Sequence, residues 1–200
     1  KTLTLTFGGS TNFENIVGSR YNDIITGDSS ANILIGSAGN DTINGGEGND
    51  IIYGEASSGG TYANQKAHLI KDYSLGSMDT NDVLNGEAGD DIIYGDIGQD
   101  TIDGGDGADT LTGGAGIDTF VIRSGDGGAS ITDADIISDF SDSNDIIGMS
   151  GLNYSQLTVE QGTGSYSSHV VVKKTDTGEF LIIIQNTNLS AVDDNDFSAI

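Results

Sequence analysis

The sequence feature that most constrains the fold is a nine-residue repeat, which runs without a break through residues 86–121. It reads GEAGDDIIY, GDIGQDTID, GGDGADTLT and GGAGIDTFV. Each unit opens with glycine, has aspartate at its sixth position and carries Ile, Leu or Phe at its eighth. Because glycine reaches positive φ without steric cost, the first six positions predict a tight turn. The last three predict a short strand with one inward apolar side chain.

One such strand cannot bury its apolar side chain alone, so the units must stack on one another. Two units form one coil of turn, strand, turn and strand. Equivalent residues then recur two units later, at about 4.8 Å, the usual spacing of paired strands. The pattern therefore predicts an all-β fold, a parallel β-roll (β-solenoid), with the sixth-position side chains stacked in a column along each edge.

The repeat also extends toward the N-terminus. Complete units occupy residues 18–26, 27–35, 36–44 and 45–53. A further unit is split, because residues 54–56 begin it and residues 81–85 complete it around an insertion. The first column of sixth-position residues is therefore Asp23, Asp41, Asp82, Asp100 and Asp118. The second column is Asn32, Asp50, Asp91 and Asp109.

Stacked aspartates repel one another unless a cation lies between them. Two unit charges about 4.8 Å apart cost roughly 0.9 kcal/mol in water, and more when they are partly desolvated. Ca²⁺ removes this repulsion and accepts about 6–8 oxygen ligands, including backbone carbonyls. The turns contain no cysteine or histidine, which argues against zinc and copper. The columns therefore predict calcium as the cofactor, with about seven ions in the gaps between successive members.

The repeat resembles the calcium-binding nonapeptide G-G-x-G-x-D-x-U-x of the RTX (repeats-in-toxin) family. In that family each ion lies between turns one coil apart. It takes carbonyls two and four of one turn, carbonyls one and three of the next, and both aspartate side chains. The resemblance thus implies that the residues of both columns are joined as metal ligands by the turn residues Ser19, Tyr21, Gly36, Ala38, Gly45, Gly46, Glu47, Gly48, Gly86, Glu87, Ala88, Gly89, Gly95, Asp96, Ile97, Gly98, Gly104, Asp106, Gly113 and Ala115. Asn32 departs from the pattern and is expected to weaken its gap, and the split unit at Asp82 interrupts the pattern.

The composition supports a cation-dependent fold. The 200 residues include 31 Asp and Glu against 7 Lys and Arg, for a formal net charge of −24. Seven calcium ions would bring that charge to about −10. Without calcium, high net charge and few aromatic residues predict disorder, so calcium binding should be coupled to folding. The acidity argues against nucleic-acid binding. The chain has no cysteine, which excludes disulfides and thiol chemistry.

The resemblance also implies a secreted, extracellular or cell-surface protein. No run is long and apolar enough to span a membrane. The start lacks Met and the features of a signal peptide, which suggests a fragment of a larger protein. RTX proteins leave the cell unfolded through type I secretion machinery, read by a C-terminal signal, and fold outside on calcium. The predicted function is therefore calcium-triggered folding that stabilises or presents an upstream domain.

The flanks predict β-rich caps on the 18–121 roll. The alternation in residues 1–17 predicts an N-terminal capping strand. In 122–200, the β-branched runs 169–174 and 180–185 predict a hairpin through 175–178. A D-x-I-x-D-F segment resembles one found after the repeats of many RTX proteins, and either a final calcium ligand or a plain capping strand fits it; the candidate ligands are Asp133, Asp135, Asp139 and Asp145. Residues 189–200 predict a last strand and resemble part of a secretion signal.

Two rival functions concern the insertion at 57–80, where residues 63–73 could form a short helix. An acidic polysaccharide or a cell surface could be bound, as in alginate epimerase repeat modules or RTX adhesins, through Lys66, Lys71, Lys173 and Lys174. A plain surface elaboration packed on the edge of the roll is the preferred explanation of the insertion, and an enzyme within the insertion is the second rival. An enzyme is not expected, because His68 and His169 have no nucleophile placed beside them by a recognisable motif.

Overall fold

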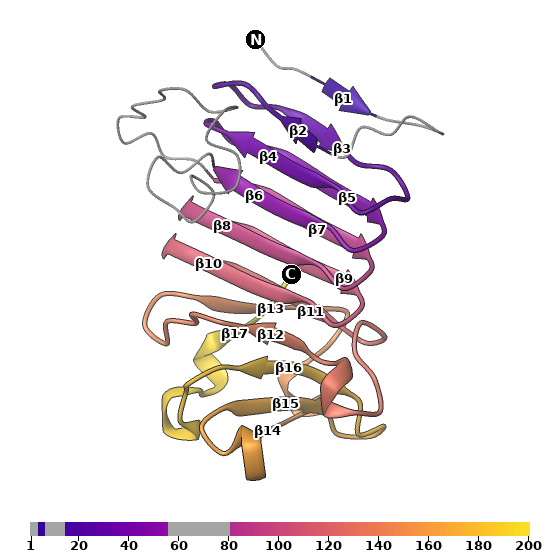
Figure 1. The fold of residues 1–200 in the computed structure, drawn as a ribbon. Helices are drawn as coiled ribbons and strands as arrows, with labels where there is room; N and C mark the ends of the chain where they lie inside the picture. The colour runs from indigo at the N-terminus through magenta and orange to yellow at the C-terminus, as the bar shows by residue number, and fades with distance from the viewer. Residues whose placement is uncertain (1–3, 7–14, 56–80) are drawn as a thin grey trace.

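The computed structural model describes residues 4–6, 15–55 and 81–200 (Figure 1). The predicted helix at 63–73, with Lys66, His68 and Lys71, lies outside the described residues. Among those that are described, helical structure is confined to five short 3₁₀ turns, η1 (Ile131–Asp133), η2 (Tyr154–Gln156), η3 (Gly164–Tyr166), η4 (Leu189–Ala191) and η5 (Asp194–Asp196). None of the described helices has the length and apolar character needed to cross a membrane.

The strands form two sheets, and from β1 to β13 they alternate between them. One sheet runs in the order β1 (Thr4–Thr6), β3 (Ile24–Thr26), β5 (Thr42–Glu47), β7 (Val83–Ala88), β9 (Thr101–Asp106), β11 (Thr119–Arg123), β13 (Ile146–Ser150) and β17 (Phe197–Ala199). The other runs in the order β14 (Leu157–Gln161), β15 (Val170–Lys174), β16 (Phe180–Ile184), β12 (Asp135–Ile137), β10 (Thr110–Gly116), β8 (Ile92–Gly98), β6 (Ile51–Glu55), β4 (Ile33–Ser37) and β2 (Asn15–Val17). The chain therefore winds as a parallel β-roll, as predicted, and the colour in Figure 1 advances down the stack from β2 to β12.

The strand register keeps the repeat in phase from coil to coil. Ile33 pairs with Ile51, and Ile92 pairs with Thr110, each two units along. Across the insertion Ile51 pairs with Ile92, so the residues added between β6 and β7 leave the pairing unchanged. Because a one-residue slip would turn every apolar side chain outward, this register is strongly fixed by the core.

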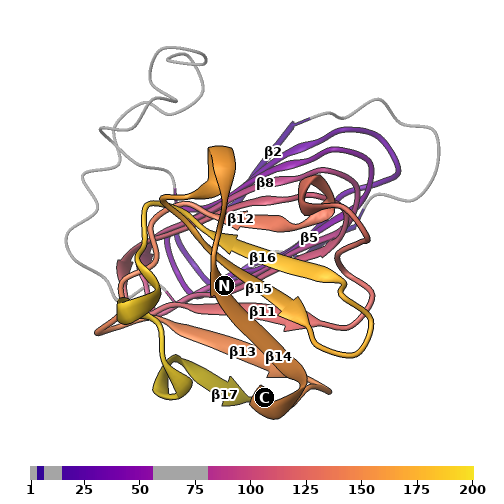
Figure 2. The same ribbon diagram turned by 90° about the horizontal axis from the view of Figure 1, so that it is seen from below.

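Figure 2, which views the stack from below, shows the two sheets as two facing layers. The core is a double row of eighth-position side chains between these sheets. These side chains are fully buried, except for Ile16 at 6% exposure, and they are Ile16, Ile25, Leu34, Ile43, Ile52, Leu84, Ile93, Ile102, Leu111 and Phe120. Ile137 and Ile147 extend the two rows past the last repeat, since they pair with Leu111 and Phe120. Each fully buried apolar side chain stabilises the fold by roughly 1.5–3 kcal/mol.

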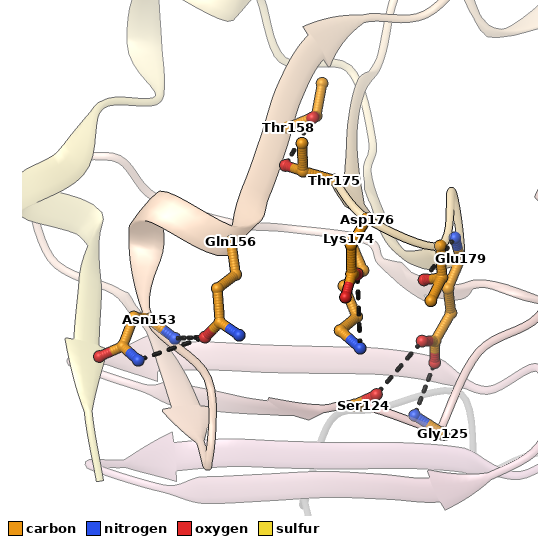
Figure 3. A network of polar contacts seen from close by, with 10 residues as sticks. Ser124, Gly125, Asn153, Gln156, Thr158, Lys174, Thr175, Asp176 and Glu179 are labelled. Carbon is orange, nitrogen blue, oxygen red and sulfur yellow. Dashed lines mark hydrogen bonds and ion pairs between the residues drawn. The ribbon is translucent and has the colours of Figure 1, made fainter.

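The C-terminal region closes the roll by joining both sheets. β15 and β16 pair antiparallel as the predicted hairpin, but β16 also pairs parallel with β12 and so continues the roll. The predicted last strand, β17, pairs parallel with β13. The hairpin is attached to the preceding loop by Glu179, whose carboxylate accepts hydrogen bonds from the Gly125 N–H at 2.6 Å and the Ser124 hydroxyl at 3.4 Å (Figure 3).

Candidate metal sites

The sixth-position residues form two hydrogen-bonded ladders along the edges of the roll. In each step the backbone N–H of one residue donates to Oδ1 of the residue one coil further on, at 2.6–3.0 Å. The steps of the first column join Asp23, Asp41, Asp82, Asp100 and Asp118. Those of the second column join Asn32, Asp50, Asp91 and Asp109. One side-chain oxygen of each accepting residue is therefore fixed by the backbone.

The second carboxylate oxygen is buried without a hydrogen-bond donor at several steps. Oδ2 of Asp50, Asp91, Asp109 and Asp118 accepts no hydrogen bond from the described part of the chain. Each of these residues is at most 1% exposed. Burying a carboxylate oxygen without a partner is unfavourable in free energy. A ligand that supplies positive charge is therefore expected beside these four atoms.

The glycine that opens each repeat lies against a side-chain oxygen of the sixth residue, which is Oδ2 wherever that residue is aspartate. A Cβ added to Gly86 would come closer than 3.0 Å to Oδ2 of Asp91 and to the carbonyl oxygen of Gly104, one coil further on. Gly45 stands in the same relation to Asp50 and to the Gly86 carbonyl. A carboxylate oxygen and a carbonyl oxygen thus converge beside each of these glycines, and no side chain fits there.

Burial also changes the acidity of these aspartates. It raises the pKa of Asp50 and of Asp109 to about 7, and that of Asp118 to about 6. The pKa of Asp91 is raised for the same reason. Near neutral pH and without a cation, the carboxyl groups of Asp50 and Asp109 are therefore partly protonated in the folded chain.

The donor set fits a hard divalent cation. In the described ranges, no three Asp, Glu, His or Cys side chains converge as a metal site. A cation beside the columns would therefore need backbone carbonyls as further ligands. Calcium accepts such all-oxygen sets of about 6–8 ligands in flexible geometry, whereas Mg²⁺ demands a near-ideal octahedron.

Comparison with known proteins identifies the repeat. The RTX calcium-binding nonapeptide repeat matches four times, at residues 8–43, 26–58, 78–102 and 86–120. The chain carries RTX calcium-binding repeats. No curated protein matches the sequence.

Two solved structures match most of the chain at low sequence identity. The extracellular lipase LipA from Serratia marcescens is 17% identical, covers 95% of this chain and has a TM-score of 0.42. The AlgE6R3 subunit of the mannuronan C5-epimerase from Azotobacter vinelandii is 22% identical, covers 96% of this chain and has a TM-score of 0.36. The matched region makes up 86% of that subunit but only 40% of the lipase.

The two parts of the split RTX unit come together in space. Asp41 N–H donates to Oδ1 of Asp82 at 2.7 Å, and Asp82 N–H donates to Oδ1 of Asp100 at 2.8 Å. A Cβ on Gly54 would meet Oδ2 of Asp82 and the carbonyl oxygen of Gly95, as in the uninterrupted units. Residues 54–55 and 81–85 therefore belong to one turn and strand, and Asp82 keeps its place in the first column.

Two turns near the N-terminus hold their sixth-position residue by local hydrogen bonds. The Ser19 hydroxyl donates to Oδ1 of Asp23 at 3.1 Å. Asn32 accepts the Asp28 N–H through Oδ1 at 2.9 Å and donates from Nδ2 to the Asp28 carboxylate at 3.4 Å. The amide of Asn32 thus supplies a donor inside its own turn, where the RTX pattern has a carboxylate.

The remaining predicted carbonyl donors lie in the turns or at the strand ends that enter them. Several of these strand ends reach positive φ at non-glycine residues, with Glu87 at 75° and Asp96 at 73°. This is the left-handed region, which costs energy for residues with a side chain. These turns therefore keep a left-handed backbone at the second position of the repeat even where that residue is not glycine.

Both columns continue past the last RTX unit, which the repeat period alone does not reveal. The Asp109 N–H donates to Oδ1 of Asp135 at 3.0 Å, and the Asp118 N–H donates to Oδ1 of Asp145 at 3.1 Å. The separations along the chain are 26 and 27 residues, against 18 within the repeats. The D-x-I spacing around Asp135 and Asp145 was the available signal, because it matches the strand half of a repeat.

The other two acidic candidates beyond the repeats have different partners. Asp139 accepts hydrogen bonds from the N–H groups of Gly113 at 2.9 Å and Gly114 at 2.8 Å. Asp133 accepts the Ser130 N–H at 3.0 Å in the capping box of η1. Neither takes a column position.

The described residues of the predicted polysaccharide surface are already paired. Lys173 contacts Glu160 at 2.5 Å and lies over the Phe180 ring, while Lys174 contacts Asp176 at 3.4 Å. Lys66 and Lys71 lie outside the described residues. His169, the described histidine, accepts the Asn186 N–H through Nδ1 at 3.0 Å, which is a structural contact.

Proposed function

We propose that this chain is a calcium-dependent folding module of an exported protein, which binds calcium in its RTX turns and thereby orders the roll. The single observation that carries the proposal is that the buried Oδ2 atoms of Asp50, Asp91, Asp109 and Asp118 accept no hydrogen bond from the residues that the structure describes. A cation beside these atoms would remove their desolvation penalty and the repulsion along each column. The predicted carbonyl donors of the neighbouring turns would complete the coordination.

Coupling between binding and folding follows from the charge. A formal net charge of −24 opposes compaction, and each bound Ca²⁺ lowers it by two. One site filled at 100-fold over its Kd adds about 2.7 kcal/mol of stability, so several sites together could decide whether the chain folds. Because the carboxylates must be deprotonated to bind metal, binding should also release protons.

Export would bring such a module into the calcium of the extracellular medium. We propose that the chain passes through type I secretion machinery unfolded and folds in the extracellular medium, where the roll stabilises or presents an upstream domain. Family membership of the repeats supports this placement. The proposal gives the chain a binding and folding role and no catalytic one. It includes no polysaccharide surface on β15, because Lys173 and Lys174 are already paired with carboxylates.

A calcium titration followed by far-UV circular dichroism tests the proposal, with magnesium as the ionic control. A cooperative gain of β structure with calcium, absent with magnesium, is the expected result. The matched variants are Asp91→Asn, which keeps an Oδ1 acceptor for the Asp50 N–H, and Asp142→Asn, which makes the same charge change at an exposed position. The first should shift the midpoint to higher calcium and the second should not. A chain that is fully folded in chelator would refute calcium-triggered folding.

A further inference from the structure

The turn that follows β16 is attached to the cap hairpin by the imidazole ring of His169, directly before β15. We propose that His169 is a pH-sensitive latch: its neutral ring holds the turn at 185–189 on the hairpin, and its protonated ring releases that turn. The latch lies outside every matched RTX unit and takes no part in the aspartate columns. It therefore adds a response to pH in the cap that is separate from calcium binding in the roll.

The contacts of Nδ1 fix the protonation state in which the latch is closed. Nδ1 accepts the Asn186 N–H at 3.0 Å, and the Ser168 hydroxyl lies 3.3 Å from the same nitrogen. Since a neutral imidazole accepts at one nitrogen and donates from the other, Nδ1 carries no proton here and Nε2 carries it. A proton on Nδ1 would make two donors face each other, and the bond to Asn186 would be lost.

The backbone at this turn depends on support from its neighbours. Asn186 has a φ of 53°, in the left-handed region that is uncommon for residues with a side chain, although Asn tolerates it better than most. On its N-terminal side the Gln185 N–H donates to the Ile137 carbonyl at 2.9 Å, which belongs to β12. The bond to His169 therefore holds the next step of the chain, where the backbone turns away from β16.

Gln161 of β14 supplies a second attachment of the same turn, and its amide does not titrate. Oε1 accepts the Leu189 N–H at 2.8 Å. Nε2 donates to the carbonyls of His169 at 2.7 Å and Thr187 at 3.4 Å. Beyond Leu189 the chain passes through η4 and η5 to β17, the outermost strand of its sheet, which pairs with β13 (Figure 2). Loss of the His169 bond would leave the tail on Gln161 and on this three-residue strand, so the turn should open while the roll stays folded.

The groups around the ring offer no replacement for the lost bond. Tyr166 of η3 is the titratable neighbour, and its ring meets that of His169 edge-on at 6.1 Å between centroids. Glu160 lies in β14 beside β15, but its carboxylate is bound to Lys173 at 2.5 Å. Residues 185–188 include no charged side chain. Among the contacts that the structure describes, the protonated ring therefore gains no carboxylate partner.

Amide hydrogen exchange in saturating calcium tests the latch. Protection factors, which are corrected for the intrinsic effect of pH on exchange, would be measured by NMR between about pH 8 and pH 5, where histidine gains its charge. We expect the protection of the Asn186 amide to fall by about five- to tenfold, as for the loss of one hydrogen bond, with a smaller fall at Leu189. The Ile92 N–H, which donates to the Asp50 carbonyl at 2.9 Å, reports whether the roll stays folded.

His169→Asn is the matched variant for this test. Its amide oxygen can take the place of Nδ1 as the acceptor, and it gains no proton in this range. The protection of the Asn186 amide should therefore be independent of pH in His169→Asn, while His68→Asn should behave as wild type. The proposal is overturned if wild-type protection at Asn186 does not change with pH, or if the same change persists in His169→Asn.

A measurement on the wild-type chain keeps the test decisive if His169→Asn does not fold. Nitrogen-15 chemical shifts of the imidazole show which ring nitrogen carries the proton. At about pH 8 we expect the proton on Nε2, and at about pH 5 a proton on both nitrogens, with the Asn186 amide resonance moving at the same midpoint. A neutral ring that carries its proton on Nδ1, or an Asn186 amide that does not follow the ring, would overturn the latch.

Discussion

The backbone N–H of Asp41 donates to Oδ1 of Asp82 at 2.7 Å, which reproduces the contact at 2.8 Å between Asp23 and Asp41. Residues 42–81, which include the insertion, lie between Asp41 and Asp82 along the chain, yet the column passes this point without a change in geometry. The paired strands agree, since Ile43 and Leu84 face each other in β5 and β7. The roll therefore tolerates the insertion at a turn, where added residues do not disturb the ladder.

Replacing residues 57–80 with a single glycine should consequently leave the roll folded. The joined sequence would read Gly-Glu-Ala-Gly-Asn-Asp, which matches residues 86–91 apart from Asn for Asp at the fifth position. We expect a calcium-dependent circular dichroism transition at an unchanged midpoint. Adding Asp82→Asn to the shortened chain provides the control, because it should raise the midpoint. A shortened chain that no longer folds in calcium would mean that the insertion is part of the folding unit.

The core and the columns could be predicted because each depends on one position within the nine-residue unit. An apolar side chain at the eighth position, such as that of Ile93, is buried only when the units stack. The Asp at the sixth position lies two residues earlier in the same unit. The stacking period then places every equivalent residue. The same reasoning gave β15 and β16 as a hairpin from two β-branched runs and a turn.

The structure beyond the repeats depended on long-range pairing that the local pattern does not encode. The loop between β11 and β12 changes the spacing, so Asp135 could be grouped only with Asp133, Asp139 and Asp145 as one of several candidates. The parallel pairing of β16 with β12 joins segments far apart in sequence, and a hairpin pattern specifies only one edge of a strand. The hydrogen bonds of Asn32 with Asp28 likewise depend on side-chain geometry within one turn.

Truncating a core residue should destabilise the calcium-bound roll far more than truncating its neighbour on the outer face. Ile93 is fully buried, whereas Ile92, the preceding residue of β8, is 37% exposed. Ile93→Ala should cost about 2–5 kcal/mol through lost burial and the cavity that remains. Ile92→Ala should cost less than about 1 kcal/mol, within the range of strand propensity differences. Urea denaturation in saturating calcium measures both, and equal losses would contradict the inward orientation of the eighth position.

Acid should favour the calcium-free fold and oppose calcium binding. Burial raises the pKa of Asp50 and Asp109 to about 7 and that of Asp118 to about 6 in the folded chain. In the unfolded chain these groups titrate near 3.9, roughly the value for an exposed Asp. The folded chain therefore holds protons that the unfolded chain releases. This stabilisation is fully present below about pH 4 and is lost as the pH rises through 6–7.

Circular dichroism in chelator across this pH range checks the prediction. More β structure is expected at pH 5 than at pH 8, and the double variant Asp50→Asn, Asp109→Asn should flatten the dependence. Calcium affinity should change in the opposite sense and fall on acidification, because protons compete for the same oxygens. A calcium-free fold that gains stability with rising pH would show that these carboxyl groups are not buried as described.

Asn32→Asp should lower the stability of the calcium-free chain and strengthen calcium binding. Asn32 donates from its amide to the Asp28 carboxylate, and its N–H donates to Oδ1 of Asp50 at 2.7 Å. The substitution replaces the amide donor with a second carboxylate beside Asp28, which should cost about 1 kcal/mol in chelator. It also places a charge in the column one step before Asp50, whose Oδ2 has no donor in the described chain. In saturating calcium we therefore expect tighter binding or one more ion, and a higher melting temperature than wild type.

Asn22→Asp, at an exposed position of the preceding unit, is the matched control and should change neither calcium binding nor the melting temperature. If Asn32→Asp melts lower than wild type in saturating calcium, the amide is required for the turn itself and the gap before Asp50 does not accept an ion.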